Sequence, residues 1–373
     1  MPDSHVDNLK VGVSGTPGTG TATVGSAASG CRGFVAGDNG KTFSGRWTDG
    51  TAWETASGCL YTHSGTTLAR GTLLASSTGS RLSLTSAAVF ECSPVADFGN
   101  RVELLAMSAT PGGRLTLESG VAISSADQTA KTTIYYTPFL HDIISLWDGA
   151  NWRAVEFVET SLALGTLTSG RPYDVFGYLS GGALALELLA WTNDTTRATA
   201  VTLQDGRYCK SGDKTRLLLG SFYTTSTTTT EDSEANRYLA NLYNQFARTL
   251  VHTTGDAGHT YQSTTVRPYN NNTAHRVNFM SCVAAELVAF GAAYVNASLA
   301  GSAGDIFIGY DSTTASSAAW TAFSNSNLSS VRGAASGGLL ALAGAHYVQL
   351  LERGHGTNAV TYSFGLLRGT VKC

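Results

Sequence analysis

The chain has 373 residues, which is long enough for two or three domains at about 150 residues each. Only 14% of the residues are charged, against a usual level of about 25%, and there are 42 glycines but 7 prolines. The formal net charge of -3 and the pI near 6.2 exclude the basic surface of a nucleic-acid-binding protein, for which a pI above about 9 is expected. We therefore expect a densely turned β protein that hides much of its surface against neighbours and binds no nucleic acid.

The sequence contains no recognisable membrane segment or secretion signal. Its longest apolar run, residues 283–295, is interrupted by Glu286 and Gly291 and falls short of the roughly 18 uninterrupted residues of a membrane helix. Residues 1–20 lack the basic and apolar regions of a signal peptide. We expect a protein that does not insert into membranes and stays in the cytoplasm until it is released.

The cysteines are spaced unlike any common metal motif, and they are Cys31, Cys59, Cys92, Cys209, Cys282 and Cys373. Without a secretion signal, an even number of cysteines is weak support for disulfides. We expect reduced and mostly buried thiols, with Cys373 as the exception.

Residues 1–96 predict an N-terminal β domain of short strands and tight turns. Strand-like segments rich in β-branched and leucine residues cover residues 21–24, 68–84 and 87–92. The run from Gly37 to Thr42 is similar to a phosphate-binding loop, but Val35 occupies the position of that motif's first glycine and a strand-like segment follows in place of a helix. A hairpin turn at Asn39-Gly40 is the favoured interpretation.

Two tryptophans, Trp47 and Trp53, flank an Asp49-Gly50 turn, and Trp147 and Trp152 repeat this arrangement further along the chain. Paired indoles can stack on a sugar ring, because the ring face covers apolar C–H groups while the N–H can donate a hydrogen bond. The alternative is cross-strand packing, in which aromatic pairs add roughly 0.2–1 kcal/mol to a sheet. Packing is the favoured interpretation, and glycan contact by Trp47 and Trp53 is the functional hypothesis.

A domain boundary is expected near residue 96, because Ser93-Pro94 breaks the strand pattern. The central domain, residues 97–250, contains the strongest turn chemistry of the chain, with Asp148-Gly149 and Asp205-Gly206 between alternating apolar residues. Strands are predicted over residues 98–105, 115–121, 153–158, 173–178, 184–191 and 199–203.

The central domain is expected to close on one short α-helix over residues 232–247. Leu239, Leu242, Tyr243 and Phe246 have the spacing of one helical face, and acidic residues occupy the first turn. Either the domain's own sheet covers this face, which we favour, or three copies meet with Leu239, Leu242 and Phe246 inside. The threonine-rich tract before it, residues 224–230, is expected to be a solvated loop or hinge.

The C-terminal domain, residues 251–373, is predicted to be a sandwich or jelly roll. Residues 249–265 have the composition of a linker or long loop. Short strands between glycine and serine clusters are expected over residues 277–281, 305–310, 346–351 and 360–367.

Four segments of the central domain resemble a module of the structural proteins of tailed bacteriophages: residues 134–139, 146–152, 170–176 and 186–197. Glu231-Asp232-Ser233 matches the closing turn of that module, and residues 6–96 are more weakly similar to an N-terminal β domain of the same class of proteins. The resemblance implies a virion component of the tail-fibre or head-fibre type, and it supplies no catalytic residues.

No catalytic or metal-binding motif is apparent in the sequence. The histidines form no metal spacing, and no Gly-x-Ser-x-Gly motif occurs. The acid pairs Asp142 with Asp148 and Asp305 with Asp311 are interpreted as turn residues, although sequence alone does not remove a glycosidase pair. A trimer could also bring His252, His259 and His275 to a threefold metal site, an interpretation that we do not favour for want of ligand spacing.

We therefore expect an all-β, non-enzymatic protein of two or three sandwich or jelly-roll-like domains with one short helix. From the resemblance, residues 1–96 would attach to the virion, and the whole would be a homotrimeric tail-associated fibre or adhesin whose partners are itself, other virion proteins and a host-surface glycan. A head fibre or decoration protein and a tail-spike polysaccharide hydrolase are the alternatives. No cofactor is expected.

Overall fold

A computed structural model describes residues 8–92, 110–255, 257–296, 303–317, 330–356 and 358–373. The elements of these residues are β-strands and three single-turn 3-10 segments, η1 (Ala36–Asp38), η2 (His63–Gly65) and η3 (Tyr269–Asn271). The all-β prediction is confirmed. The chain divides into two compact units, residues 1–106 and 107–373, each described by itself below.

The first unit is a small closed barrel, whereas the sequence predicted a sandwich or jelly roll. Its strands are β1 (Lys10–Ser14), β2 (Ala22–Ala27), β3 (Thr42–Asp49), β4 (Ala52–Thr62), β5 (Thr67–Leu68), β6 (Thr72–Ser76) and β7 (Val89–Cys92). They run in the order β3-β7-β1-β2-β5-β4, and β4 pairs back with β3. Closure is achieved by the 11-residue β4, which is long enough to pair with β3, β5 and β6. The barrel encloses aromatic side chains, among them Phe43, Trp47 and Phe90.

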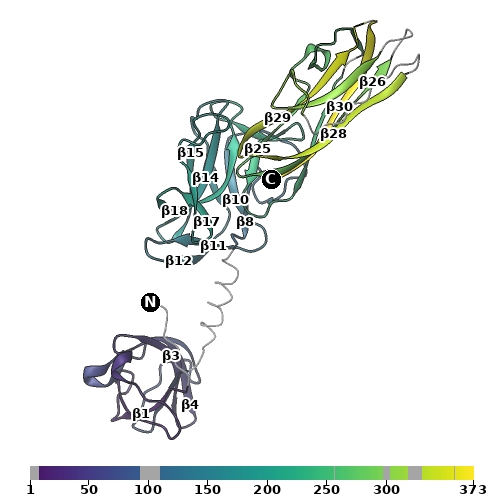
Figure 1. The fold of residues 1–373 in the computed structure, drawn as a ribbon. Helices are drawn as coiled ribbons and strands as arrows, with labels where there is room; N and C mark the ends of the chain where they lie inside the picture. Colours follow the sequence, from purple (N-terminus) through teal and green to yellow (C-terminus); the bar gives the residue numbers. More distant parts are fainter. Residues whose placement is uncertain (1–7, 93–109, 256, 297–302, 318–329, 357) are drawn as a thin grey trace. The chain divides into compact units, whose positions relative to one another are not determined.

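The second unit begins with sheets that enclose one hydrophobic core (Figure 1). One side is formed by β8 (Gly113–Thr116), β10 (Thr133–Pro138) and β13 (Thr160–Ala163), with the hairpin β11 (Ile143–Trp147) and β12 (Trp152–Glu156). The other is the sheet of β14 (Pro172–Ser180), β15 (Ala183–Ala190), β16 (Val201–Gln204), β17 (Arg207–Lys210), β18 (Asp213–Tyr223) and β21 (Leu239–Asn241).

The rest of the second unit consists of two further sheets, whose buried apolar side chains form two more core clusters. One contains β9 (Gln128–Lys131), β19 (Thr230–Asp232), β20 (Asn236–Arg237), β24 (Arg267–Pro268), β25 (Arg276–Ser281), β27 (Gly304–Tyr310) and β29 (Gly344–Gly354). The other contains β22 (Ala247–Thr253), β23 (His259–Tyr261) and the long neighbours β26 (Ala285–Asn296), β28 (Ser330–Ala341) and β30 (Val360–Lys372) (Figure 1). Since β9, β19 and β20 lie in the sheet of β25 and β29, the predicted boundary at residue 250 does not coincide with a gap between sheets and falls inside β22.

The predicted helix over residues 232–247 is wrong. Leu239 lies in β21 and is buried, and Asn244 has a φ of 55°, which a right-handed helix does not allow. Asn241 accepts a hydrogen bond from the Leu115 N–H at 2.7 Å and donates one to the Leu115 carbonyl at 3.2 Å. Tertiary hydrogen bonds of this kind override a helical spacing of apolar residues, because propensity is a weak prior.

Two loop predictions are also corrected. Residues 249–265, expected to be a linker, include β22 and β23, and both strands pair with β30. The threonine tract at 224–230 is a loop with an exposed tip, as predicted, but its ends are anchored, since Thr224 and Thr230 are fully buried and pair with each other. Threonines at both ends of this tight turn replace solvent contacts with hydrogen bonds to the backbone.

Most other predicted strands are confirmed within the described residues, but the strand expected over 115–121 is largely wrong, because β8 ends at Thr116. The strand expected over 98–105 and the boundary near residue 96 lie outside them. Residues 81–84 form only a single bridge, between Gly18 and Leu84, and not the predicted strand. Among the described residues no helix has the length and apolar character needed to span a bilayer.

Candidate functional site

Two predicted turns from distant parts of the sequence meet at one cluster in the second unit. The loop after β11 closes on Asp148, whose Oδ1 accepts hydrogen bonds from the Ala150 and Asn151 N–H groups at 2.9 and 2.8 Å. The β16–β17 hairpin turns at Asp205-Gly206 with φ values of 52° and 78°, as a type I′ turn requires. We call the five side chains that the turns and β18 bring together the tryptophan cluster: Trp147, Trp152, Asp205, Arg207 and Lys214.

The two indoles of the tryptophan cluster touch because Trp147 and Trp152 are direct cross-strand partners. Their ring centroids are 5.6 Å apart with an interplanar angle of 66°, an edge-to-face arrangement. Lys214 Nζ lies 4.8 Å from the Trp147 centroid, and the Arg207 guanidinium carbon lies 4.6 Å from that of Trp152. Each indole therefore holds a cation near one ring face.

Asp205 connects the indoles to the cations. Its Oδ2 accepts hydrogen bonds from Trp152 Nε1 at 3.0 Å and from Lys214 Nζ at 2.8 Å. The hydrogen bond from Lys214, followed by that from Trp152, lowers the pKa of the Asp205 carboxyl below its ordinary value of 3.8. The carboxylate therefore stays ionised at neutral pH and fixes the orientation of the Trp152 ring.

The tryptophan cluster has the chemistry of a binding surface. Both indoles are half-buried, while Asp205 is exposed. Aromatic faces suit the C–H groups of a sugar, and nearby carboxylate and ammonium groups can hydrogen-bond to its hydroxyls.

The first tryptophan pair does not form such a surface, so glycan contact by both Trp47 and Trp53 is corrected. Trp47 is fully buried in the barrel, where the Arg70 guanidinium lies 5.0 Å from its ring centroid. Trp47 pairs with Glu54, and Trp53 pairs with Thr48. Neighbouring residues of a strand face opposite sides, so Trp53 lies on the outer face and cannot share a sugar with Trp47.

The predicted subunit interface is not a helical stripe. Leu239 is buried in the core of the second unit, and Leu242 packs against the neighbouring core. Phe246 is half-buried, with the Arg114 guanidinium carbon 4.8 Å from its ring centroid. The three side chains therefore have separate environments within the chain itself.

The histidines proposed for a metal site do not converge. His252 and His275 lie together, with Nε2 and Nδ1 3.1 Å apart, but His259 Nε2 instead contacts the buried Glu352 carboxylate at 2.5 Å. Within the part of the chain that the structure describes, no three groups of metal-ligand type are grouped to hold an ion.

The acid pairs considered for glycoside hydrolysis are also separated. Asp142 and Asp148 flank the five-residue strand β11, and Asp305 and Asp311 are separated by most of β27. At about 3.3 Å per residue, each pair is roughly 20 Å apart along its strand, well beyond the roughly 5–9.5 Å of glycosidase carboxyls. Asp305 accepts a hydrogen bond from His355 at 3.0 Å, and Asp311 contacts His346 at 2.8 Å. Neither pair is therefore arranged for glycoside hydrolysis.

Cys373, expected to be the exceptional cysteine, is a buried free thiol like Cys209 and Cys282. Burial raises the pKa of Cys209 to about 11 and those of Cys282 and Cys373 to about 12. Cys31 is the partly exposed free thiol.

No family model matches the chain, and no curated protein matches it. A solved structure of the infectious bursal disease virus VP2 subviral particle is similar at a TM-score of 0.24 and 14% identity, over 70% of this chain and 69% of that chain. The structure of T=1 particles derived from the same virus is similar at a TM-score of 0.15 and 12% identity, over 70% of this chain and 74% of that chain. A tryptic core variant of Cry1Da from Bacillus thuringiensis is similar at a TM-score of 0.18 and 8% identity, over 65% of this chain and 50% of that chain. Two of these three are proteins of viral particles, but TM-scores this low define no common fold.

Proposed function

We propose that the chain is a structural component of a tailed-phage virion, acting as a homotrimeric, tail-associated fibre or adhesin that contacts the host surface. One observation carries this proposal. The segments that resemble the phage module contribute to β10, the β11–β12 hairpin, β14 and β15, which surround a single core. The resemblance therefore covers a folded unit and not a set of scattered matches.

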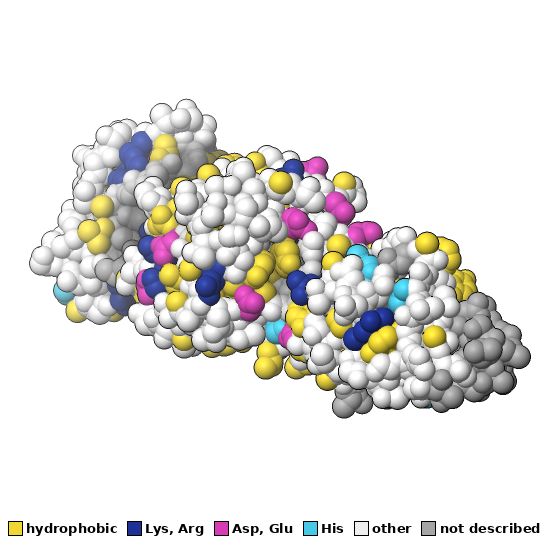
Figure 2. Space-filling view, turned by 90° about the horizontal axis from the view of Figure 1, so that it is seen from above, with side chains coloured by type: hydrophobic (Ala, Val, Ile, Leu, Met, Phe, Trp, Pro, Cys, Tyr) yellow, Lys and Arg dark blue, Asp and Glu magenta, His cyan; other side chains and the backbone are white. Residues whose placement is uncertain are grey.

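The character of the surface supports a role in contact. Backbone and side chains that are neither hydrophobic, charged nor histidine cover most of the face in Figure 2, and the basic and acidic side chains are scattered over it. The half-buried indoles of the tryptophan cluster offer the host-facing chemistry of an adhesin, because they can stack on sugar rings.

The test is to label intact particles with an antibody against the chain and to locate it by electron microscopy. Label on the tail, together with binding of the purified full chain to host cells, is the expected result. Absence of label from particles would overturn the proposal. Release of reducing ends from host polysaccharide by the purified chain would instead support the tail-spike hydrolase.

A head fibre or decoration protein is the second candidate, favoured by the outer face of the β26–β28 pair. Val288 and Leu340 are 52% and 65% exposed there, and exposed apolar side chains suit docking on the surface of a capsid. This role predicts label on the head and binding of the purified chain to empty capsids.

A further inference from the structure

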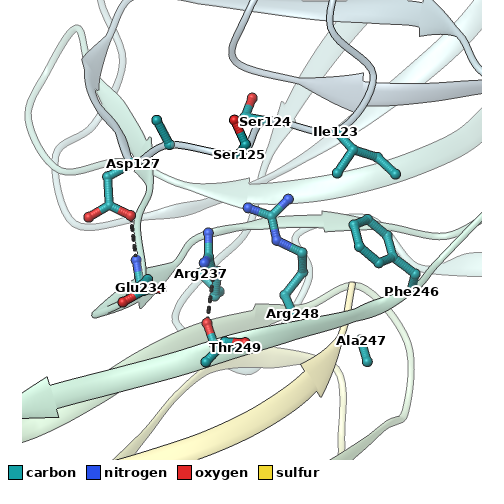
Figure 3. A pocket seen from close by; sticks show the side chains of 11 residues that line it. Ile123, Ser124, Ser125, Asp127, Glu234, Arg237, Phe246, Ala247, Arg248 and Thr249 are labelled. Atoms are coloured by element: carbon teal, nitrogen blue, oxygen red, sulfur yellow. Dashed lines mark hydrogen bonds between the residues drawn. The ribbon is translucent and has the colours of Figure 1, made fainter.

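A pocket of about 210 Å³ opens in the second unit between residues 123–127 and the start of β22 (Figure 3). This volume is below the roughly 300–1,000 Å³ of sites for drug-sized ligands, so the pocket suits one small group. Arg237 and Arg248 line it and are only 5% and 8% exposed. We call it the arginine pocket.

The two guanidiniums are held in different ways. Arg237 Nε donates to the Thr249 carbonyl at 3.0 Å, and its Nη1 donates to Asp232 Oδ1 at 3.2 Å. Arg248 Nη2 lies 3.2 Å from Asp232 Oδ2. Figure 3 shows the head of Arg248 extending into the pocket towards Ser124 and Ser125. One nitrogen of Arg248 is therefore held by Asp232, while the guanidinium group is directed at the space that a ligand would occupy.

The buried groups around the pocket carry more positive than negative charge. A third guanidinium, Arg114, is 3% exposed, and it donates to the Ala122 and Cys373 carbonyl oxygens at 3.3 and 3.2 Å. Asp232 is the carboxylate that pairs with both Arg237 and Arg248. Burial lowers the pKa of Arg114 to about 10, and the Arg248 charge acts in the same direction, while the charges of Cys373 and Asp232 oppose them. An added anion would stabilise the charged form of these buried guanidiniums.

The rim of the pocket selects among anions. Asp127 and Glu234 lie there and are exposed, and Asp127 Oδ1 accepts a hydrogen bond from the Glu234 N–H at 2.9 Å. These solvated carboxylates are screened, yet they disfavour a doubly charged phosphate more than a singly charged carboxylate.

The remaining walls match a sugar ring. The half-buried Phe246 ring lies beside the Arg114 and Arg248 guanidinium carbons, 4.8 and 5.7 Å from its centroid, and brings apolar area to the pocket. Ser124 and Ser125 lie on the opposite wall (Figure 3). These groups complement a uronic acid. The guanidinium can bind its carboxylate, the serine hydroxyls can bind its hydroxyls, and the aromatic ring can cover its C–H face.

We propose that the arginine pocket binds the carboxylate of an acidic sugar residue of a host-surface polysaccharide, with Arg248 as its anchor. This inference rests on the proposed function as a host-contacting virion protein. The carboxylate would accept hydrogen bonds from the Arg248 fork, Phe246 would cover the C–H face, and Ser125 would bond to a ring hydroxyl.

The test is an NMR titration of the full chain with galacturonate, with galactose and inorganic phosphate as comparison ligands. Galacturonate is expected to bind more tightly than either, and to bind less tightly as salt is added. Arg248→Met should weaken its binding about 10- to 100-fold, since hydrogen bonds to charged groups are strong. Arg276→Met is the matched control, because Arg276 packs over Tyr347 and does not line the pocket, and it should bind like the wild type.

The proposal is overturned if galacturonate does not bind, if phosphate binds more tightly, or if Arg248→Met binds unchanged. If Arg248→Met melts at a lower temperature than the wild type, Arg248→Lys is used in its place. Lysine keeps the positive charge but lacks the planar guanidinium with its paired N–H donors, so galacturonate binding should still fall about tenfold. Unchanged binding by Arg248→Lys counts against the proposal. Wild-type chain that binds host cells but not galacturonate refutes the pocket alone, whereas galacturonate binding without cell binding refutes the proposed function.

Discussion

The chain contains two tryptophan pairs around Asp-Gly turns, and the structure uses them in opposite ways. Trp47 is fully buried inside the barrel of the first unit, whereas Trp147 and Trp152 are both half-buried and in contact. The difference lies in the pairing register. Trp147 is the direct partner of Trp152, while Trp47 and Trp53 are offset by one residue and face opposite sides. A one-residue offset thus decides whether the two tryptophans of a hairpin face the same side or opposite sides.

The largest expected effect is on the buried member of the first pair. Trp47→Ala removes a fully buried indole and the ring beneath the Arg70 guanidinium. We expect the first unit to lose about 3–5 kcal/mol of unfolding free energy, measured by denaturant titration. A loss below about 1 kcal/mol would show that Trp47 is not the core residue described above.

The second pair should contribute much less to stability. Trp147→Ala together with Trp152→Ala removes an edge-to-face contact worth about 0.5–1.5 kcal/mol beyond the area that the rings bury. Acrylamide should quench these indoles in the wild type more readily than Trp47. If the double variant unfolds the second unit, the pair belongs to the core and the comparison fails.

The Asp205 carboxylate gives the tryptophan cluster a pH dependence. Its pKa is lowered by Lys214 and Trp152, so its contribution is present above the ordinary value of 3.8 and is lost as pH falls through the lower folded value. We expect tryptophan fluorescence to change below about pH 4 and Asp205→Asn to abolish that transition. If the fluorescence transition persists in Asp205→Asn, it belongs to another titrating group.

The smallest effect is on thiol labelling. The pKa of Cys209 is raised by burial to about 11, and Cys31 is partly exposed. In the native chain near pH 8, a thiol reagent should modify Cys31 before Cys209, because the thiolate is the reactive form. Equal labelling rates, read by peptide mass spectrometry, would contradict the buried position of Cys209 in β17.

Much of the strand content could be predicted, because turn chemistry acts locally. Asp205-Gly206 adopts the positive φ values that its residues favour, and the strands on either side follow. The fate of Leu239 could not be predicted, because its spacing fits a helix and only the hydrogen bonds between Asn241 and Leu115 select a strand. The tryptophan cluster could be anticipated only in part. The sequence marks both turns, but the contact between Trp152 and Asp205 joins residues 53 apart.

The arginine pocket gave no sequence signal for a related reason. Arg114, Arg237 and Arg248 are far apart in the chain and follow no motif, and they come together only through the pairing of β8, β20 and β22 with their neighbours. Phe246, predicted to lie on a helical face covered by the domain's own sheet or, as the alternative, by a trimer, lies beside these arginines because no helix forms there.

The most direct test of the central claim is binding of the purified full chain to host cells, with the Trp147→Ala, Trp152→Ala double variant compared with Trp53→Ala. We predict that the double variant loses binding while keeping its fold, because both indoles are only half-buried and reach solvent. Trp53→Ala should bind like the wild type, since that indole has no aromatic partner across the turn. Wild-type binding by the double variant, or loss of binding in Trp53→Ala alone, would contradict the account.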